Sequence, residues 1–282
     1  MPELPEVELI RKKLEKYLKG HRIKEVDIKY KKCFRGKKDK IVGGKIIKVR
    51  RFGKVLSIDL SNGYSVIIHI KLTGQLIYRG LNLKRPPQLP ESVKDGLEGK
   101  HTHAVFHLDK GGTLYFIDVR KFGWIDTHES SKIESGNVFV KNLGPEPFRG
   151  LTRGVFGKIL KSDRAVKTLL MDQKKIAGIG NIYANEALWL AGINPETRAV
   201  KLDSERAKTL FDSIEKVLKE GLKKGGASDN SFLTPDGKQG NYQKHFLVYG
   251  RKGEKCLRCK GEIEKGKVSG RGTYFCPRCQ KT

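Results

Sequence analysis

The sequence predicts an α+β fold: an N-terminal helix with an antiparallel β-sandwich, then a helical region that ends in a cysteine-containing β-hairpin. Apolar residues recur at helical spacing over the first eighteen positions. Short alternating segments separated by turn signals then extend to about residue 126. Helical spacing returns after residue 150. With 282 residues, the chain is long enough for two domains with cores of their own.

The N-terminal segment predicts a helix that begins beside Pro2. Apolar residues lie three or four positions apart, at Leu4, Val7, Ile10, Leu14 and Leu18, and Gly20 follows where a helix would end. If Met1 is removed, Pro2 becomes a secondary amine, and the positive end of the helix dipole disfavours its protonated form. Such an amine is a nucleophile toward carbonyl-like carbon, including a sugar C1′. Taken alone, the pattern also fits a proline that only starts a helix.

The alternating segments predict the β-sandwich. Three of them are Val55–Leu60, Tyr64–His69 and 104–108, and the pairs Asn62-Gly63 and Gly111-Gly112 are hairpin signals. Strands at this spacing are typical of an antiparallel sandwich or barrel. Residues 81–99 are polar and contain prolines, which predicts a surface loop.

The second half predicts a helical domain. Apolar and charged positions alternate at helical spacing over 152–160, 165–171, 181–190 and 203–223. Residues 227–242 are rich in Gly, Ser, Asn and Asp and predict a loop. We therefore expect a first domain at 1–130, a linker at 131–150, a helical domain at 151–242 and a cysteine-containing hairpin at 243–282.

The charge of the chain predicts a polyanionic partner. There are 58 basic and 31 acidic residues, a formal net charge of +27. Nucleic acid is the first candidate partner and an anionic membrane the second. The sequence contains no run of 18 apolar residues and no apolar signal stretch, so we expect a soluble intracellular protein.

Four of the five cysteines predict a metal site. Two Cys-x-x-Cys pairs stand 16 residues apart, which suits four thiolates around one structural Zn²⁺ ion: Cys256, Cys259, Cys276 and Cys279. Basic residues decorate this unit and would present charge to DNA or RNA, although a purely structural clip fits the same spacing. Cys33 stands alone and is expected to be a small core residue.

Residues 174–186 predict two helices joined by a glycine turn. Gly178 and Gly180 would let the backbone approach a partner closely, and the N-terminus of the second helix can bind a phosphate. Asn181 would then contact DNA without reading its sequence. The alternative is that Asn181 is an ordinary helix N-cap.

Residues 118–123 follow a predicted strand and predict a side-chain pair for insertion into a duplex. Arg120 and Phe122 lie two positions apart, so on a continuing strand they project to the same side. Such a pair could fill the gap left by an extruded base. The alternative places Phe122 in the core. His69 begins a second segment of this kind, which runs to Gly74.

Together these motifs resemble the formamidopyrimidine-DNA glycosylase branch of the bacterial glycosylase/lyase family that includes endonuclease VIII. The resemblance covers nearly the whole chain, and the Leu-Pro-Glu opening favours this branch. The motifs that carry it are residues 1–8, 50–54, 69–74, 100–103, 118–123, 143–147, 178–186 and 248–251, with the closing cysteine hairpin. The resemblance implies a helix-two-turn-helix domain and a bifunctional repair enzyme that removes oxidised purines, chiefly 8-oxoguanine and formamidopyrimidines.

The resemblance also implies the roles of individual residues. The four implied catalytic residues are Pro2, Glu3, Lys54 and Arg271. Pro2 would be the nucleophile, Glu3 the proton donor to the sugar, and Lys54 an acid/base and phosphate-binding residue. Arg271 would contact the lesion's flanking phosphates and assist δ-elimination. The implied DNA contacts are His69, His101, Arg120, Lys167 and Asn181. The implied void-filling residues are Leu72, Arg120 and Phe122, and the implied residues of the lesion pocket and its capping loop are Glu6 and Lys238. The family usually has methionine where this chain has Leu72, which is similar in volume but stiffer.

Two other functions fit parts of the pattern. One is an endonuclease VIII-like preference for oxidised pyrimidines, and the other is a zinc-containing protein that binds damaged DNA without catalysis. The presence of Pro2, Glu3 and Lys54 favours catalysis. The expected partner is double-stranded DNA with oxidised bases or abasic sites, without a membrane, and the protein is expected to be a cytoplasmic, nucleoid-associated monomer.

Overall fold

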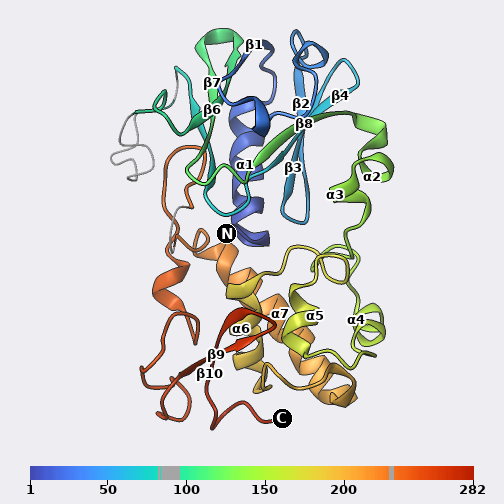
Figure 1. Cartoon of the computed structure of the whole chain (residues 1–282), viewed down its shortest axis with the longest axis vertical. Helices are drawn as coiled ribbons and strands as arrows, with labels where there is room; N and C mark the ends of the chain where they lie inside the picture. Colours follow the sequence, from blue (N-terminus) through green and yellow to red (C-terminus); the bar gives the residue numbers. More distant parts are fainter. Residues whose placement is uncertain (82, 84–95, 229–231) are drawn as a thin grey trace. The chain divides into compact units, whose positions relative to one another are not determined.

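The computed structural model describes residues 1–81, 83, 96–228 and 232–282 (Figure 1). The chain forms two compact units. The first unit consists of residues 1–141 and 224–241, and the second of residues 142–223 and 242–282. The predicted fold class is confirmed in both. Most of the loop predicted at 81–99 lies outside the described residues.

The first unit begins with helix α1, Leu4–Leu18. Glu3 is its N-cap residue, and the Glu3 and Glu6 side chains form a capping box with each other's backbone N–H groups. One face of the helix is buried, with Val7, Ile10 and Leu14 in the core. The apolar periodicity of the sequence therefore gives the helix that it predicts.

Among the described residues, eight strands form the sandwich of the first unit. One sheet has the order β1-β6-β7-β5 and the other β2-β3-β4-β8, and every pairing is antiparallel. The strands are β1 Ile23–Ile28, β2 Ile46–Phe52, β3 Val55–Leu60, β4 Tyr64–His69, β5 Gly74–Arg79, β6 Thr102–Leu108, β7 Thr113–Asp118 and β8 Trp124–Glu129. Asn62-Gly63 and Gly111-Gly112 lie between β3 and β4 and between β6 and β7, as predicted.

A single apolar core joins α1 to both sheets. It includes residues of α1, of β2 to β4 and of β5 to β7, and α1 contacts strands from each sheet. Cys33 lies in this core, as expected from the sequence, and burial raises the pKa of its thiol to about 11. The core fixes the position of α1 relative to the strands. It therefore also fixes where Pro2 lies at the start of the helix.

The predicted linker, 131–150, is partly folded structure of the first unit. Helices α2 (Ile133–Gly136) and α3 (Val138–Lys141) lie in it, directly after β8. Ile133 and Val140 are buried, and the Phe139 ring lies 4.5 Å from that of Trp124. Short helices with few apolar residues give a weak periodic signal, so the sequence did not reveal them.

Residues 224–241 also differ from the predicted division, which put the loop 227–242 in the helical domain. Phe232 packs in the core of the first unit, and Leu233 packs with Ile77 and Ile117. The Tyr78 N–H donates to the Pro235 carbonyl at 2.8 Å. These contacts join two parts of the chain that are far apart in sequence, and local patterns do not report such contacts.

The second unit is helical, with a C-terminal hairpin. Its helices are α4 Arg153–Ile159, α5 Val166–Met171, α6 Asn181–Ala191 and α7 Ser204–Lys223. The hairpin strands are β9 Glu264–Val268 and β10 Arg271–Phe275. Short 3-10 helices occur in both units, at Lys31–Cys33, Lys38–Lys40, Asp109–Gly111, Ser130–Lys132, Ala199–Lys201 and Tyr242–His245. Among the described residues, no helix is long and apolar enough to cross a membrane.

Candidate active site and nucleic-acid interface

Pro2 lies buried at the N-terminus of α1, while Met1 is 41% exposed. Glu3 is buried next to it, and its N–H donates to Glu6 Oε2 at 2.8 Å. Glu6 Oε1 accepts from the Ala227 N–H at 2.9 Å. Both carboxylate oxygens of Glu6 therefore bind backbone amides, which fix the first turn of α1.

Strand β2 runs beside α1 and ends at Phe52, two residues before Lys54. Glu15 accepts from the Val49 N–H, and Glu8 accepts from the Arg51 side chain, so α1 and β2 run in opposite directions. Burial raises the pKa of Glu8, but the contacts with Arg11 and Arg51 outweigh this effect. The pKa of Glu8 therefore lies below its usual range. The paired carboxylate thus fixes the register of helix and strand.

Lys54 occupies the β2–β3 turn and is only 5% exposed. Because Leu56 pairs with Ile68 and His69 with Trp124, this turn lies at the same end of its sheet as the end of β4 and the start of β8. We call residues 53–54, 70–73 and 119–123 the loop end of the sandwich. Burial, followed by the charges of Lys71 and Lys54, lowers the pKa of His69 to about 3. His69 is therefore neutral at physiological pH, and its Nδ1 accepts from the Lys71 N–H at 3.1 Å.

Asp118 ties two of the loops at this end together. Its Oδ1 accepts from Thr73 Oγ1 at 2.5 Å and from the Arg120 N–H at 3.2 Å, and its Oδ2 accepts from the Gly123 N–H at 2.7 Å. Asp118 is fully buried. One carboxylate thereby joins the loop that carries Leu72 to the loop that carries Arg120 and Phe122.

The strand-spacing argument for Arg120 and Phe122 was wrong, because β7 ends at Asp118 and the chain turns at Lys121, whose φ is 57°. The two side chains are nevertheless together: the Arg120 guanidinium lies 4.9 Å from the centre of the Phe122 ring. Phe122 is 52% exposed, so it does not belong to the core. Leu72 is half-buried. The structure thus brings the three predicted void-filling residues to one end of the first unit, by a turn instead of a strand.

His101, a further predicted DNA contact, is half-buried beside this region. Its carbonyl accepts from the Asp118 N–H at 2.9 Å. The neighbouring His103 donates through Nε2 to the Asp118 carbonyl at 2.7 Å. His101 is therefore attached to the same residue that organises the two loops.

In the second unit, Asn181 begins α6 and contacts the hairpin. Gly180 is the N-cap residue, so Asn181 is not the cap that the sequence allowed as an alternative. Asn181 Nδ2 donates to the Gly272 carbonyl at 3.0 Å. One turn further on, Asn185 Oδ1 accepts from the Tyr274 N–H at 2.9 Å. Helix α6 and strand β10 are thus held in register by two asparagine side chains.

The side chain of Lys167 is placed differently from the expected phosphate contact. The residue is 1% exposed on α5, and its Nζ donates to the Gly272 carbonyl at 2.9 Å and to Thr273 Oγ1 at 2.7 Å. Both Lys167 and Asn181 therefore bind the same hairpin carbonyl. In this structure the charge of Lys167 is directed at the hairpin backbone.

Arg271 is exposed at the first position of β10. It follows the two-residue turn Ser269-Gly270, in which both φ angles are positive, 48° and 75°. This turn geometry matches the twist of a hairpin. The carbonyl of the next residue is the one held by Lys167 and Asn181, so the backbone that presents Arg271 is fixed from two sides.

The four predicted metal ligands come together in the second unit. The sulfur atoms of Cys256, Cys259, Cys276 and Cys279 all lie within 4.8 Å of one another. The Cys256–Cys279 and Cys259–Cys276 separations are 3.8 and 3.5 Å. Four thiolates about 2.3 Å from a tetrahedral Zn²⁺ lie close to 3.8 Å apart. The residues thus fit one structural zinc ion, which would brace the hairpin that carries Arg271.

Lys238, the predicted capping-loop residue, is exposed after a closed turn of the first unit. Its N–H donates to Thr234 Oγ1 at 3.1 Å, and its carbonyl accepts from the Thr234 N–H at 2.9 Å. The turn is stabilised by its own backbone, and the Lys238 side chain extends from it.

Sequence reasoning missed the buried carboxylates that organise these sites. Besides Asp118, Glu186 of α6 accepts from the N–H groups of Leu247, Val248 and Tyr249 at 2.8 to 2.9 Å. Burial raises the pKa of Glu186, although these three amides oppose the shift. A charged residue inside an otherwise apolar helical stretch was the available signal, since such residues are rarely buried unless paired.

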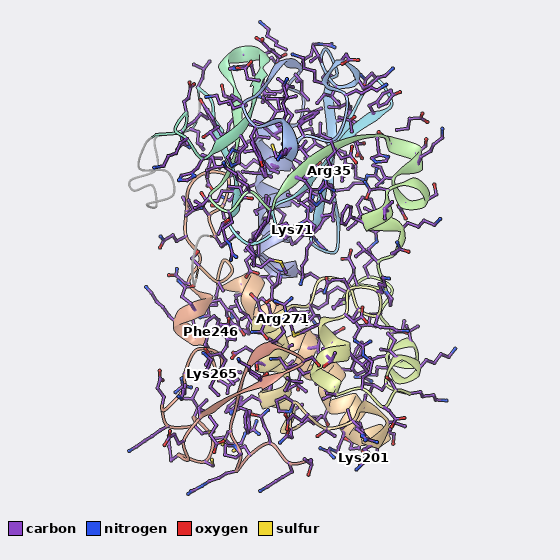
Figure 2. All side chains as sticks on the ribbon, viewed as in Figure 1. Arg35, Lys71, Lys201, Phe246, Lys265 and Arg271 are labelled. Carbon is purple, nitrogen blue, oxygen red and sulfur yellow. The ribbon has the colours of Figure 1, made fainter. Side chains whose placement is uncertain are left out.

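A cationic cluster near Leu72 was also missed. The Arg35 guanidinium lies 5.0 Å from the Trp124 ring and 5.6 Å from the Phe139 ring, and the Lys71 ammonium lies 5.5 Å from Phe139. Burial, followed by the charge of Arg35, lowers the pKa of Lys71. Figure 2 labels Arg35 and Lys71. The sequence offered no signal for this cluster, because its members are far apart in the chain.

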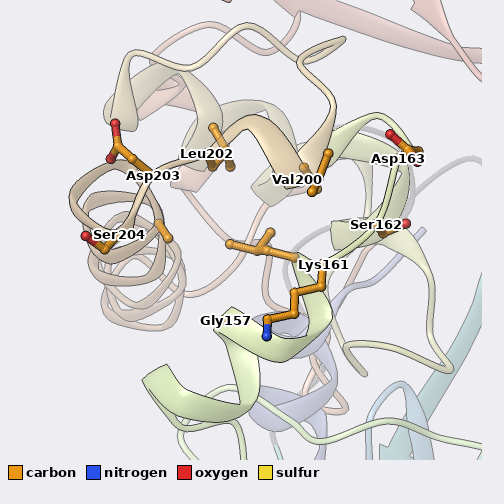
Figure 3. Close-up of a pocket in the computed structure, with 11 residues that line it drawn as sticks. Gly157, Lys161, Ser162, Asp163, Val200, Leu202, Asp203 and Ser204 are labelled. Carbon is orange, nitrogen blue, oxygen red and sulfur yellow. The ribbon is translucent and has the colours of Figure 1, made fainter.

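A cavity of about 580 Å³ in the second unit lies apart from these residues. It is bordered by α4, the segment 160–163, the segment 199–203 and the N-terminus of α7 (Figure 3). Its lining residues, all in the described part of the chain, include none of the predicted site residues. The predicted chemistry is thus carried by loops and by a hairpin, outside this cavity.

The fold and the site together define a class: a zinc-containing DNA glycosylase of base excision repair. Three family models match the chain. They are the formamidopyrimidine-DNA glycosylase N-terminal domain at residues 1–125, the H2TH domain of the same enzymes at 143–232, and the zinc finger found in FPG and IleRS at 253–282. The chain belongs to the formamidopyrimidine-DNA glycosylase family.

Relatives and solved structures agree over the full length. The chain is 41% identical to the formamidopyrimidine-DNA glycosylase of Pelotomaculum thermopropionicum, covering 100% of this chain and 99% of the relative. It is 36% identical to that of Bacillus subtilis, covering 99% of each. The Lactococcus lactis Fpg in complex with abasic-site DNA is 34% identical, with a TM-score of 0.87 and coverage of 99% and 100%. The wild-type Lactococcus lactis enzyme with N7-benzyl-Fapy-dG DNA is 35% identical, with a TM-score of 0.86 and full coverage of both chains.

Proposed function

We propose that this enzyme flips oxidised purines out of duplex DNA, removes them through a covalent bond to Pro2, and then cleaves the strand by β- and δ-elimination. The observation that carries the proposal is the buried start of α1, where Pro2 adjoins Glu3 and a capping box fixes the first turn. An amine held at a helix N-terminus is disfavoured in its protonated form. The solved complexes of relatives with Fapy-dG and abasic-site DNA support the same substrate class.

The first step forms a bond between the Pro2 nitrogen and C1′ of the flipped nucleotide. The bond from C1′ to the base breaks, and the base leaves with a proton. Glu3 donates a proton to the sugar ring oxygen, so the ring opens and the Pro2 nitrogen, having lost its own proton, becomes an iminium. A nucleophile that splits one difficult step into two easier ones is the general logic of covalent catalysis.

The iminium acidifies the hydrogen at C2′. Loss of that proton expels the 3′ phosphate in β-elimination, and loss of a second proton from the sugar expels the 5′ phosphate in δ-elimination. Lys54 is the proposed acid/base and phosphate-binding residue of this stage, as the family resemblance implies, and it is buried in the β2–β3 turn. Arg271 is the proposed contact to the flanking phosphates, because it is exposed on a braced hairpin.

The remaining residues would grip and distort the duplex. His69, His101, Arg120 and Asn181 are proposed DNA contacts, and Lys167 is proposed to act by holding the hairpin that presents Arg271. Leu72, Arg120 and Phe122 are proposed to fill the space of the extruded base, since side chains inserted between base pairs stabilise such a distortion. Glu6 and Lys238 are proposed to support lesion recognition.

The predicted domains have different proposed roles. We propose that residues 1–130 carry catalysis, 151–242 and 243–282 carry DNA binding with the capping loop, and 131–150 join them, although residues 133–141 pack with the first unit. The proposed place of action is the bacterial cytoplasm, on the nucleoid. One zinc ion per chain, held by the four cysteines, has a structural role.

Borohydride trapping tests the function. The wild-type protein, incubated with an 8-oxoguanine duplex and borohydride, should give a covalent protein–DNA adduct, because the reagent reduces the iminium to a stable amine. Mass spectrometry of the same sample should show that Met1 is absent, because retained Met1 would acylate the Pro2 nitrogen. Absence of the adduct in a sample that lacks Met1 would refute the proposal.

Two variants complete the test. Pro2→Gly should weaken trapping, because it replaces the secondary amine by a primary one. Asn181→Ala should leave the chemistry of a bound complex intact but lower DNA affinity for all sequences alike. A panel of oxidised purine and pyrimidine lesions would identify an endonuclease VIII-like preference.

A further inference from the structure

A carboxylate on the segment 232–240 is held by two side chains of α1. Asp236 Oδ2 accepts from Lys13 Nζ at 2.8 Å and from the Tyr17 hydroxyl at 3.2 Å. Its other oxygen accepts from Thr234 Oγ1 at 2.5 Å. The Asp236 side chain is 5% exposed and that of Lys13 is 33% exposed. The pair is thus shielded at its acidic end and open to water at its basic end.

The electrostatics match this geometry. The hydrogen bond to Asp236 raises the pKa of Lys13. Burial raises the pKa of Asp236, but the bonds from Lys13 and Thr234 outweigh it, and the net pKa lies below the usual range. Both groups are therefore charged throughout the physiological pH range. Aromatic packing supports the contact, since the rings of Tyr17 and Tyr78 stack at 5.4 Å with an angle of 6°.

Asp236 sits inside the closed turn that ends at Lys238. Thr234 and Lys238 bond to each other through backbone and hydroxyl groups, and Gly237 between them has a φ of 78°. The Tyr78 N–H holds the preceding Pro235 carbonyl. Fixing Asp236 on α1 therefore fixes the position from which the exposed Lys238 extends.

The same segment is attached to α1 at a second point. Ala227 donates to Glu6, which also holds the N–H of Glu3 beside Pro2. Near this point Gly240 lies so close to Gly226 that a Cβ on Gly240 would fall 2.1 Å from the Gly226 carbonyl. Helix α1 is therefore a common platform: its N-terminus carries the proposed nucleophile, and its middle carries the anchor of the turn.

We propose that Asp236, anchored by Lys13 and Tyr17, is a positioning residue that holds the 234–238 turn on α1 and so sets how well the enzyme recognises the damaged base. The inference rests on the proposed function. In this proposal, the contact of Asp236 with Lys13 and Tyr17 affects the steps that require a damaged base. It does not affect the chemistry at Pro2. An abasic site offers no base to recognise, so its cleavage does not depend on the anchor.

An ion pair suits this task because it is specific and reversible. When the turn leaves α1, both charged groups regain water, which offsets much of the lost attraction. When one partner is deleted, the other is left without its counter-charge in the docked state, which disfavours docking. Removing both partners should therefore cost less than the sum of the single losses.

The test compares two substrates in the same duplex: 8-oxoguanine and a preformed abasic site. Single-turnover rates would be measured for the wild type, Lys13→Met, Asp236→Asn and the double variant. We expect each single variant to lose about tenfold in 8-oxoguanine excision, with abasic-site cleavage within about twofold of the wild type, and the double variant to lose no more than either single one.

Two controls define the cause. Lys12→Met removes an exposed charge from the same helix and should change both reactions equally. Lys13→Arg keeps the charge and the donor and should restore excision. The excision defect should also be independent of pH between 5 and 9, since both groups stay charged over that range.

The outcomes separate the two claims. Equal losses on both substrates, or no loss on either, would overturn the positioning role while leaving the glycosylase function intact. A wild-type protein inactive on both substrates would refute the proposed function and this inference with it. A selective loss of 8-oxoguanine excision that Lys13→Arg restores would establish the anchor.

Discussion

The two units hold the residues that we propose to contact DNA by opposite electrostatic means. In the first unit, a buried anion accepts hydrogen bonds: Asp118 accepts from the backbone of the loop that carries Arg120 and from the side chain of Thr73. In the second unit, a buried cation donates hydrogen bonds: Lys167 donates to the Gly272 carbonyl. A cluster of four cysteines also holds the hairpin.

The difference depends on which backbone groups lack a hydrogen-bond partner in a neighbouring strand. Turns after the end of a strand expose N–H groups, which a carboxylate can accept. The edge strand of a two-stranded hairpin exposes carbonyls, which an ammonium or an amide can satisfy. A short hairpin also lacks a core of its own, so it depends on the metal. The second unit should accordingly be fragile to chelation and the first unit should not.

The largest expected effect is that of zinc removal. Cys276→Ser, or a strong chelator, should unfold the hairpin, because structural zinc contributes about 10 kcal/mol or more in small metal sites. Hydrogen exchange on the full chain should show lost protection over residues 253–281 and unchanged protection in β2, β3 and β4. DNA affinity should fall by about 100-fold or more.

An equal loss of protection in the strands of the sandwich would show that the first unit also depends on the metal. Addition of zinc to the chelated protein should restore the protection, and magnesium should not, since it prefers oxygen ligands.

The next effect is that of Asp118→Ala. Three donors would lose their acceptor, and leaving buried donors unsatisfied should destabilise the first unit by about 3 kcal/mol in urea denaturation. Excision of 8-oxoguanine should also slow, because Leu72 and Phe122 would no longer be held together. Asp27→Ala, which removes a carboxylate that is half exposed, is the matched control and should cost under about 0.5 kcal/mol. Similar losses in both variants would remove Asp118 from its organising role.

A smaller effect separates the two possible roles of Lys167. If Lys167 holds the hairpin, Lys167→Met should weaken DNA binding without changing the slope of log affinity against log salt. Arg271→Ala should reduce that slope by about one, because it removes a phosphate contact and the counterion released with it. Titrations from low to moderate salt would measure both. A lower slope for Lys167→Met would instead assign Lys167 to a phosphate.

The smallest effect concerns acid stability of the first unit. Because the pKa of His69 is about 3 in the fold and about 6.5 when unfolded, the unfolded chain binds a proton that the folded chain does not. Stability should therefore fall as pH drops from about 6.5 toward 3, by about 2 kcal/mol at pH 5. His69→Asn keeps an acceptor for the Lys71 N–H and should remove this part of the pH dependence in thermal denaturation. An unchanged pH profile would contradict the assignment.

Local patterns predicted many elements of both units, although not α2 and α3. The apolar spacing over Leu4 to Leu18 gave α1, the glycine pairs gave the hairpins, and the cysteine spacing gave the metal cluster. Each is a short-range signal that depends on neighbours a few residues apart. The side chains of Arg120 and Phe122 do meet, but the strand argument for them was wrong because β7 ends before Arg120.

What the sequence by itself determined is which features predict the chemistry: a proline before a helix, four cysteines in two pairs, and an excess of 27 positive charges. What only the tertiary structure decided is how those residues are held. Asp118, Glu186 and Asp236 each bind groups on other parts of the chain, and Lys167 is directed into the hairpin. A buried charge is stable only where partners from distant segments surround it, and the positions of those partners exist only in the folded chain.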